Sequence, residues 1–225
     1  MFSRRIALFA MTAVLGSACG DSLVDVGVRH AGVRVINASS VPFDVLIDGG
    51  VSIPALSVAT VSPPVPVTAG AHIIGLRVNG VVTSINVQTT DGQTLTTVAV
   101  PGTASSVTAS VMVDTGSIVP EGKSKLRVVH LASGVPAIEI WRTQPDFQTP
   151  VHIMTPFAYL AQSPYLQSDP GAWEVFITAP GSTAKLATTG AISIPNGERR
   201  TVVLLDSAGV MRLRVIADLS IGVEQ

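Results

Sequence analysis

Residues 33–42 read VRVINASSVP, and nearly the same stretch returns as LRVVHLASGVP at residues 126–136. In both copies a branched strand with one arginine leads to a small-residue turn and then to Val-Pro. A stretch that recurs at such a distance indicates a duplicated domain, in which each copy forms one structural unit. The fold of the chain is therefore the fold of one unit, present twice.

Three further pairs of motifs follow in the same order in both halves. They are Gly70–Ile74 with Gly171–Val175, Asp91-Gly92 with Asn196-Gly197, and Val111–Asp114 with Val215–Asp218. Each half closes on an aspartate after a branched strand. We expect unit 1 at residues 32–115, a linker at 116–123 and unit 2 at 124–220.

The composition favours short strands joined by tight turns. The 225 residues are 47% hydrophobic but only 13% charged, with 20 glycines and 15 prolines as turn formers. Valine, alanine and threonine prevail, as is typical of all-β proteins. The apolar fraction is ample for a packed core, which excludes a disordered chain. The formal net charge of -1 provides no basic surface for nucleic acid.

Strand patterns recur at intervals of roughly 8–12 residues. In unit 1 they predict strands at 33–38, 43–48, 56–62, 72–78, 81–88, 94–100 and 107–114. In unit 2 they predict strands at 126–131, 137–142, 151–159, 172–178, 186–194, 200–206 and 210–217. The pairs Asn79-Gly80 and Asp91-Gly92 predict tight hairpin turns with positive φ. The expected fold class is all-β, with two tandem antiparallel immunoglobulin-like β-sandwich domains.

The N-terminus predicts export. Arg4 and Arg5 precede an uncharged apolar run at residues 6–15. This run is too short to span a bilayer, which takes about 20 residues. Small residues at 16–18 then lead to Cys19, the only cysteine. The order is typical of a secretory signal peptide at residues 1–18, followed by a tether at residues 19–31.

Cys19 resembles the first mature residue of bacterial lipoproteins, which receives a diacylglycerol anchor. Gly16 departs from the usual larger aliphatic residue at its position, and an ordinary signal peptidase would cut the same bond. A lone cysteine at the cleavage point has no structural use and forms no disulfide within the chain. We expect Cys19 to be the lipid attachment site of a bacterial envelope protein, anchored on the periplasmic or outer face of a membrane.

The opening of each unit resembles the domain of unknown function 4397 family. In unit 2 the resemblance rests on residues 126–133 and Val135–Ile140, and in unit 1 on residues 33–39 and Val41–Val45. Pro170–Trp173 is similar to a proline-alanine-glycine turn of that family. The resemblance implies exported, often lipid-anchored bacterial proteins with a sandwich fold, and it implies no enzymatic activity.

No motif predicts a metal, a cofactor or a nucleophile. The four histidines, which zinc sites would use in local pairs, are widely separated: His30, His72, His130 and His152. No Gly-x-Ser-x-Gly motif is present.

Four acids recur at matching places in the repeat: Asp44, Glu139, Asp114 and Asp218. A pair of carboxylates is the usual equipment of a glycosidase, so a hydrolase acting on envelope polymers is one alternative function. We expect no catalytic residues, because two copies of one module seldom both keep a catalytic pair.

Aromatic residues distinguish the two units. Of the eight aromatic residues that follow the signal peptide, only Phe43 lies in unit 1. Unit 2 also has six more residues between Glu139 and Gly171 than unit 1 has in the matching interval. Rings on the loops of a rigid sandwich suit recognition of a sugar or a protein.

The alternative role for these rings is core filling, which we expect for Trp173 and Phe176. Trp141 and Phe147 are then the possible partner contacts. The sequence favours a non-catalytic, envelope-anchored protein that binds an envelope protein or glycan, and a purely structural spacer is the other alternative.

Overall fold

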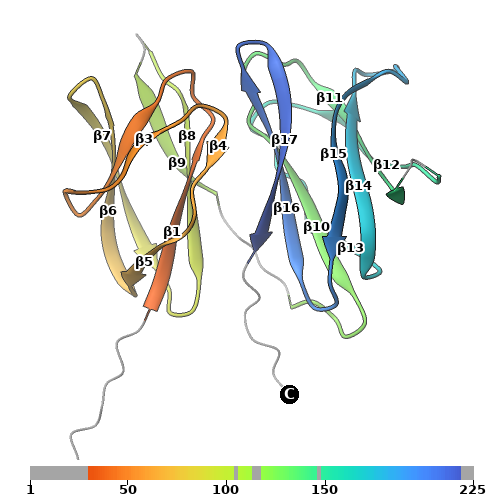
Figure 1. Cartoon of the computed structure of the whole chain (residues 1–225), viewed down its shortest axis with the longest axis horizontal. Coiled ribbons are helices and arrows are strands. Elements are labelled where there is room, and N and C mark those ends of the chain that lie inside the picture. The colour runs from red at the N-terminus through yellow and green to blue at the C-terminus, as the bar shows by residue number, and fades with distance from the viewer. Residues whose placement is uncertain (1–29, 104–105, 113–117, 146–147, 219–225) are drawn as a thin grey trace, which may run out of the picture.

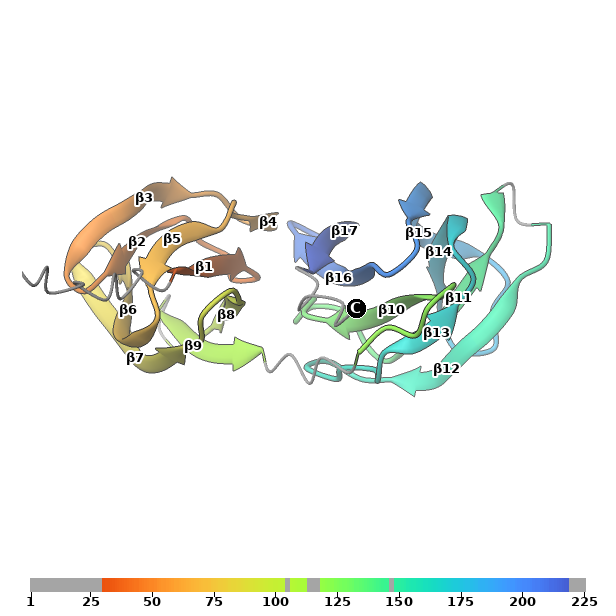
Figure 2. The ribbon, with the colours of Figure 1, turned by 90° about the horizontal axis from the view of Figure 1, so that it is seen from below.

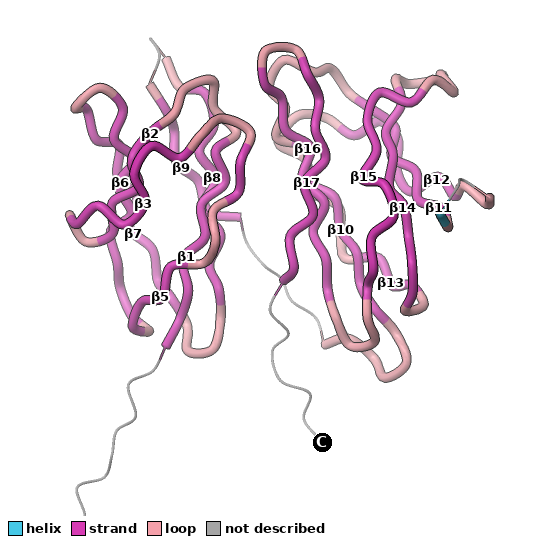
Figure 3. The backbone as a smooth tube through the Cα atoms, in the orientation of Figure 1, coloured by secondary structure: helices cyan, strands magenta, loops and turns pink. Residues whose placement is uncertain are grey.

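The computed structural model describes residues 30–103, 106–112, 118–145 and 148–218 (Figure 1). Strands joined by loops make up these residues, and apart from a 3-10 turn at Pro145 they contain no helix (Figure 3). Within the described ranges there is accordingly no helix long and apolar enough to cross a membrane. The predicted all-β class is confirmed.

Unit 1 consists of two facing sheets. Its strands are β1 (His30–Asn37), β2 (Phe43–Ile47), β3 (Gly50–Leu56), β4 (Thr60–Val61), β5 (Val65–Thr68), β6 (Gly70–Val78), β7 (Val81–Thr89), β8 (Thr94–Pro101) and β9 (Val107–Met112). One sheet has the order β4-β1-β8-β9, with β5 also paired to β1, and the other has the order β3-β2-β6-β7.

Unit 2 follows the same plan. Its strands are β10 (Ser124–His130), β11 (Ile138–Thr143), β12 (Val151–Phe157), β13 (Leu166–Ser168), β14 (Gly171–Thr178), β15 (Lys185–Ile194), β16 (Arg199–Ser207) and β17 (Val210–Asp218). The sheet orders are β13-β10-β16-β17 and β12-β11-β14-β15.

The two sheets that carry β1 and β10 lie next to each other in the middle of the molecule, and we call them the inner sheets (Figure 2). The outer sheets, β3-β2-β6-β7 and β12-β11-β14-β15, lie at opposite ends (Figure 1). Each sandwich has a core of its own between its inner and outer sheet. Val35, Val45 and Leu76 are central in unit 1, and Val128, Ile140 and Ile177 occupy the same places in unit 2.

The prediction that the sheets are purely antiparallel is wrong at one place in each unit. Strand β1 runs parallel to β8, and β10 runs parallel to β16. These strands are buried on both faces, because one face meets the core of its own unit and the other meets the neighbouring unit. Strands of this kind read as continuous apolar runs rather than as alternating patterns.

The predicted strand at residues 56–62 is also wrong. The chain turns at Asp48 and Gly49, whose φ angles are 51° and 86°, and returns as β3 beside β2. A pair of residues with positive φ forms the tight hairpin turn that joins neighbouring strands. The Asn79-Gly80 turn has the expected angles, 48° and 83°, whereas at Asp91-Gly92 only Gly92 has positive φ.

One edge strand of each outer sheet carries a proline. Pro54 lies in edge strand β3 and Pro156 in edge strand β12. The pairing of each of these strands with its neighbour is interrupted by a register shift. A proline offers no N–H to an added strand, and bulges twist an edge away, so both features oppose edge-to-edge association.

Candidate functional site

The outer sheet of unit 2 presents a row of large side chains across all four strands. Residues of β11 alternate, so that Ile138 and Ile140 enter the core whereas Glu139 and Trp141 face outward. Trp141 is paired with His152 of β12 on one side and with Phe176 of β14 on the other. The strand register thus aligns these three rings.

The rings contact one another closely. The ring centroids of Trp141 and His152 are 4.4 Å apart, and those of Trp141 and Phe176 are 6.0 Å apart with an interplanar angle of 4°. The Nζ atom of Lys185, on β15, lies 5.2 Å from the centroid of Phe176, within the range of a cation–π contact. We call His152, Trp141, Phe176 and Lys185 the aromatic ladder.

Polar groups fix the ladder from both sides. The indole Nε1 of Trp141 donates a hydrogen bond to Oγ1 of Thr178 at 3.2 Å. Oε2 of Glu139 lies 4.0 Å from Nε2 of His152, and its other oxygen accepts a hydrogen bond from the backbone N–H of Gly181. These contacts hold the rings in one orientation, which lowers the entropic cost of a later contact.

Exposure differs along the ladder. Phe176 is only 6% exposed, Trp141 is half-buried, and His152 and Lys185 are exposed. Phe176 is buried, as expected, but it lies on the outward face of β14, because its neighbours Val175 and Ile177 face the core of unit 2. Trp173 does pack against the core. Trp141, the predicted contact, is the aromatic residue at the centre of the outward row.

Thr149 is hydrogen-bonded to the end of strand β11. The backbone N–H of Thr149 donates to Oγ1 of Thr143, which is fully buried. The second predicted contact, Phe147, lies outside the described residues, as does the predicted lipid attachment site Cys19.

Unit 1 has no ladder at the equivalent place. Leu46 is paired with Gly75 where unit 2 pairs Trp141 with Phe176. A Cβ atom on Gly75 would lie 3.1 Å from Cγ1 of Val82 and 3.3 Å from Cβ of Leu46, so no ring fits there without repacking. The two units therefore differ at the positions that form the ladder in unit 2.

The recurring acids do not share a cleft in the described part of the chain. Asp44 pairs with Arg77 at 2.7 Å in the outer sheet of unit 1, and hydrogen bonds from Ala55 N–H and Arg77 lower its pKa. Glu139 lies in the outer sheet at the other end of the molecule (Figure 1). Asp218 is buried at the inner sheets, and Asp114 lies outside the described residues.

The histidines are equally dispersed. His72 bonds to Asp48, His130 is buried beneath the loop that follows β10, and His152 belongs to the ladder. In the described ranges no three His, Cys, Asp or Glu side chains gather closely enough to hold a metal ion.

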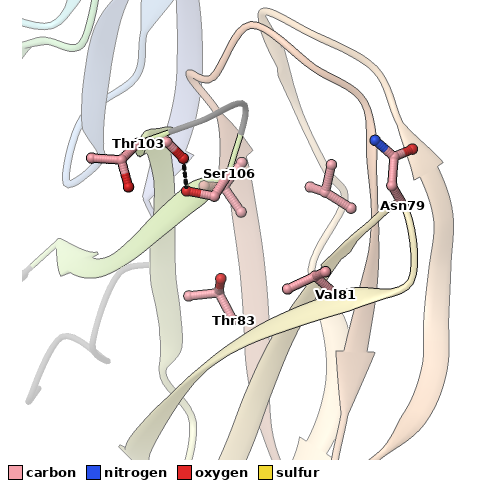
Figure 4. A pocket seen from close by; sticks show the side chains of 7 residues that line it. Asn79, Val81, Thr83, Thr103 and Ser106 are labelled. Atoms are coloured by element: carbon pink, nitrogen blue, oxygen red, sulfur yellow. Dashed lines mark hydrogen bonds between the residues drawn. The ribbon is translucent and has the colours of Figure 1, made fainter.

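A hollow of about 410 Å³ opens in unit 1 beside the β6–β7 hairpin (Figure 4). Val81, Thr83, Thr103 and Ser106 are among its lining residues, and Oγ of Ser106 donates to the backbone oxygen of Thr103. No acid, base or aromatic ring lines it, so it holds neither a catalytic pair nor a stacking surface. The ladder is the better candidate for a functional site.

Sequence reasoning missed three of the four ladder residues. The signal for Phe176 is present, because Glu174 and Thr178 flank it at a spacing of two and a strand places all three on one face. His152 and Lys185 carry no such signal, since their place beside the rings depends on strand register.

Comparison with known proteins finds one family. Residues 31–141 match the model described as "Domain of unknown function (DUF4397)". No curated protein matches the chain. A crystal structure of a leucine-rich repeat protein from Bacteroides thetaiotaomicron is similar at 9% identity with a TM-score of 0.23. A score this low supports no conclusion about fold or function. The match covers 80% of this chain but only 26% of that protein, so the chain spans about a quarter of its length.

The matched residues begin at β1, include all of unit 1 and end within β11. They contain both of the repeated openings, residues 33–42 and 126–136. Residues 31–141 of the chain therefore carry a DUF4397-like domain.

Proposed function

We propose that this chain is a non-catalytic binding protein of the bacterial envelope, whose partner contacts the aromatic ladder. The observation that carries the proposal is the half-buried Trp141 at the centre of a fixed row of rings on the outer sheet. Tryptophan is strongly enriched among the residues that dominate binding energies, particularly when neighbouring groups exclude water from it.

The geometry favours a protein partner over a glycan. Sugars stack on a free face of an aromatic ring, but His152 and Phe176 flank the indole of Trp141 on its two sides. The N–H of Trp141 is bonded to Thr178 as well. A partner can therefore contact only the outer edge of the ladder, which has the ionisable side chains of His152 and Lys185 at its two ends. Aromatic side chains together with charged and ionisable groups are typical of protein interfaces.

The proposed location in the envelope rests on the N-terminal sequence. Two arginines, an uncharged apolar run and Cys19 support export and lipid attachment. Two acyl chains on one cysteine would suffice for stable anchoring. Mass spectrometry of the mature N-terminus tests this part, and an unmodified Cys19 would contradict it.

A quantitative capture experiment tests the binding surface. Immobilised protein is offered detergent-solubilised envelope proteins of the source bacterium, and the recovered proteins are compared between wild type and Trp141→Leu. The matched control is Leu46→Ala, at the equivalent position of unit 1.

We expect one protein to be recovered by wild type and Leu46→Ala and to be at least tenfold depleted with Trp141→Leu, as for a central contact residue. Equal recovery of every protein by Trp141→Leu and wild type, with both variants folded, would contradict the proposal. Recovery of glycan in place of protein would assign the ladder to the other ligand class.

A further inference from the structure

The inner sheets of the two units share a third apolar cluster. Unit 1 contributes Ile36, Ala38, Ala59, Val98 and Met112, and unit 2 contributes Val129, Leu131, Val203, Leu205 and Ile216. All ten side chains are less than 9% exposed, so the cluster is as well shielded from solvent as either sandwich core. We call it the inter-unit cluster.

Equivalent residues of the two repeats meet in this cluster. Ile36 is the strand partner of Val98 in unit 1, and Val129 is the strand partner of Val203 in unit 2. Met112 lies opposite Thr96, and Ile216 lies opposite Thr201. The same positions thus build both sides of the interface, which is the arrangement of a two-fold symmetric dimer.

A polar contact across the interface adds specificity. Nη2 of Arg34 donates to the backbone oxygen of Ala217 at 3.0 Å, and Nη1 lies 3.9 Å from Oδ1 of Asp218. Oδ2 of Asp218 accepts hydrogen bonds from Thr201 and Tyr165. Both charged side chains are buried, and removal of one partner from a buried pair is strongly destabilising.

We infer that this interface also joins two copies of the chain, by reciprocal exchange, so that unit 1 of each copy packs on unit 2 of the other. A second copy presents the same residues, and the exchanged assembly forms the same inter-unit contacts as the single chain. Exchange of an identical element is a low-cost route to a dimer.

Chain connectivity sets the balance between the two forms. Residues 113–123 join the units, and a short connection gives an effective concentration of order millimolar for the closed chain. Exchange therefore requires a high local concentration or a weakened closed interface. The exchanged dimer presents two ladders, which would raise the avidity for a clustered partner. The inference itself does not depend on the proposed function.

A pair of charge-reversal variants tests the exchange. The Arg34→Glu substitution places a second negative charge beside Asp218 of the same chain. The Asp218→Lys substitution places a second positive charge beside Arg34 of the same chain. In a reciprocal assembly of the two variants, Arg34 of one chain meets the native Asp218 of the other, and the second interface carries the reversed pair. Both chains also carry Cys19→Ser, so that neither lipid nor a disulfide joins copies.

We expect each variant alone to be mostly monomeric and an equimolar mixture to yield a one-to-one heterodimer in native mass spectrometry. The double variant Arg34→Glu/Asp218→Lys restores the pair within one chain and should remain monomeric. A mixture of folded variants that stays entirely monomeric would overturn the inference.

If either variant loses its β-sheet circular dichroism signal, the exchange is tested instead with the chain that keeps native Arg34 and Asp218. It is refolded from urea at 1 µM and, in parallel, at a concentration about a thousandfold higher, and both samples are then compared by sedimentation. A dimer only in the concentrated sample, stable on dilution, supports exchange, whereas monomer in both samples overturns it.

Discussion

Thr97 is a residue whose side chain is fully buried although its hydroxyl finds no hydrogen-bond partner among the described residues. It is the strand partner of Val35, and in unit 2 the same place, opposite Val128, is taken by Val202. An unpaired buried hydroxyl costs roughly 1–3 kcal/mol. The second copy of the fold therefore shows which residue this position accommodates best.

We expect Thr97→Val to raise the free energy of unfolding by about 1 kcal/mol, because it removes the unpaired hydroxyl and keeps the branched shape. The reciprocal variant, Val202→Thr, should lower it by a similar amount. Urea unfolding followed by circular dichroism measures both. A loss of stability in Thr97→Val would show that the hydroxyl has a partner.

Asn37 and His130 perform one task in the two units. The side chain of Asn37 donates to the backbone oxygen of Val41 and accepts from the N–H of Ser39. Nδ1 of His130 likewise accepts from the N–H of Ala132, and Nε2 lies 3.3 Å from the oxygen of Pro136. Each of these two side chains fixes the loop after the first strand of its unit by hydrogen bonds, and His130 does so in its neutral form.

His130 and His72 should give stability opposite dependences on pH. Burial lowers the pKa of His130, so its contribution is complete above the unfolded value of about 6.5 and is lost as pH falls below it. Hydrogen bonds to Asp48 and Thr68 raise the pKa of His72, so its contribution is complete below about 6.5 and is lost as pH rises through the folded pKa.

The matched variants His130→Asn and His72→Asn separate the two effects. Relative to wild type, we expect His130→Asn to gain stability as pH falls from 7.5 to 5, because an amide takes no proton there. His72→Asn should show its largest deficit near pH 5.5 and a smaller one at pH 9. Unfolding curves across this range measure both differences, and slopes of the same sign would refute the assignment.

At the scale of elements, Pro54 and Pro156 protect one edge of each outer sheet, at β3 and β12. We expect Pro54→Val and Pro156→Val to restore an edge N–H and β-branched character, and hence to increase aggregation on mild heating. Light scattering at a temperature well below unfolding measures the effect. Val210→Thr, an exposed position in the β17 hairpin strand, is the control, and aggregation equal to that of the control would contradict the edge assignment.

Many of the strands could be predicted because alternation and branched residues dominate them, as in β9 and β17. Strands β5 and β13 were missed because they have four and three residues, too few for a period to emerge. The error at residues 56–62 arose because the turn at Asp48 and Gly49 was not recognised, which shifted the strand that follows it. The parallel pairs could not be predicted, since pairing direction depends on contacts between distant segments.

The site was predictable only in part for the same reason. Trp141 is identifiable because the two repeats can be compared with each other, and Leu46 occupies the equivalent place. His152 and Lys185 join it only through the strand register of a folded sheet. The inter-unit cluster likewise has no local signal, because its residues lie in strands that also supply the two sandwich cores.

At the scale of the whole molecule, the inter-unit cluster should make the two sandwiches stabilise each other. Ile36 is fully buried in that cluster, so Ile36→Ala should cost about 2–5 kcal/mol, as in a domain core. Val82→Ala, at a position 45% exposed on the outer sheet of unit 1, should cost at most about 0.5 kcal/mol. Scanning calorimetry compares them, and equal small losses would mean that the interface contributes little.

The central claim, that a partner contacts the ladder at Trp141, is tested most directly by fluorine NMR of protein labelled with 5-fluorotryptophan. The chain has two tryptophans, Trp141 in the ladder and Trp173 against the core of unit 2, and Trp173→Phe assigns the two resonances. On addition of unlabelled solubilised envelope protein, we predict that the Trp141 resonance shifts while that of Trp173 keeps its position. A shift of Trp173 alone, or unchanged positions of both resonances in a sample that retains the bound partner, would contradict the claim.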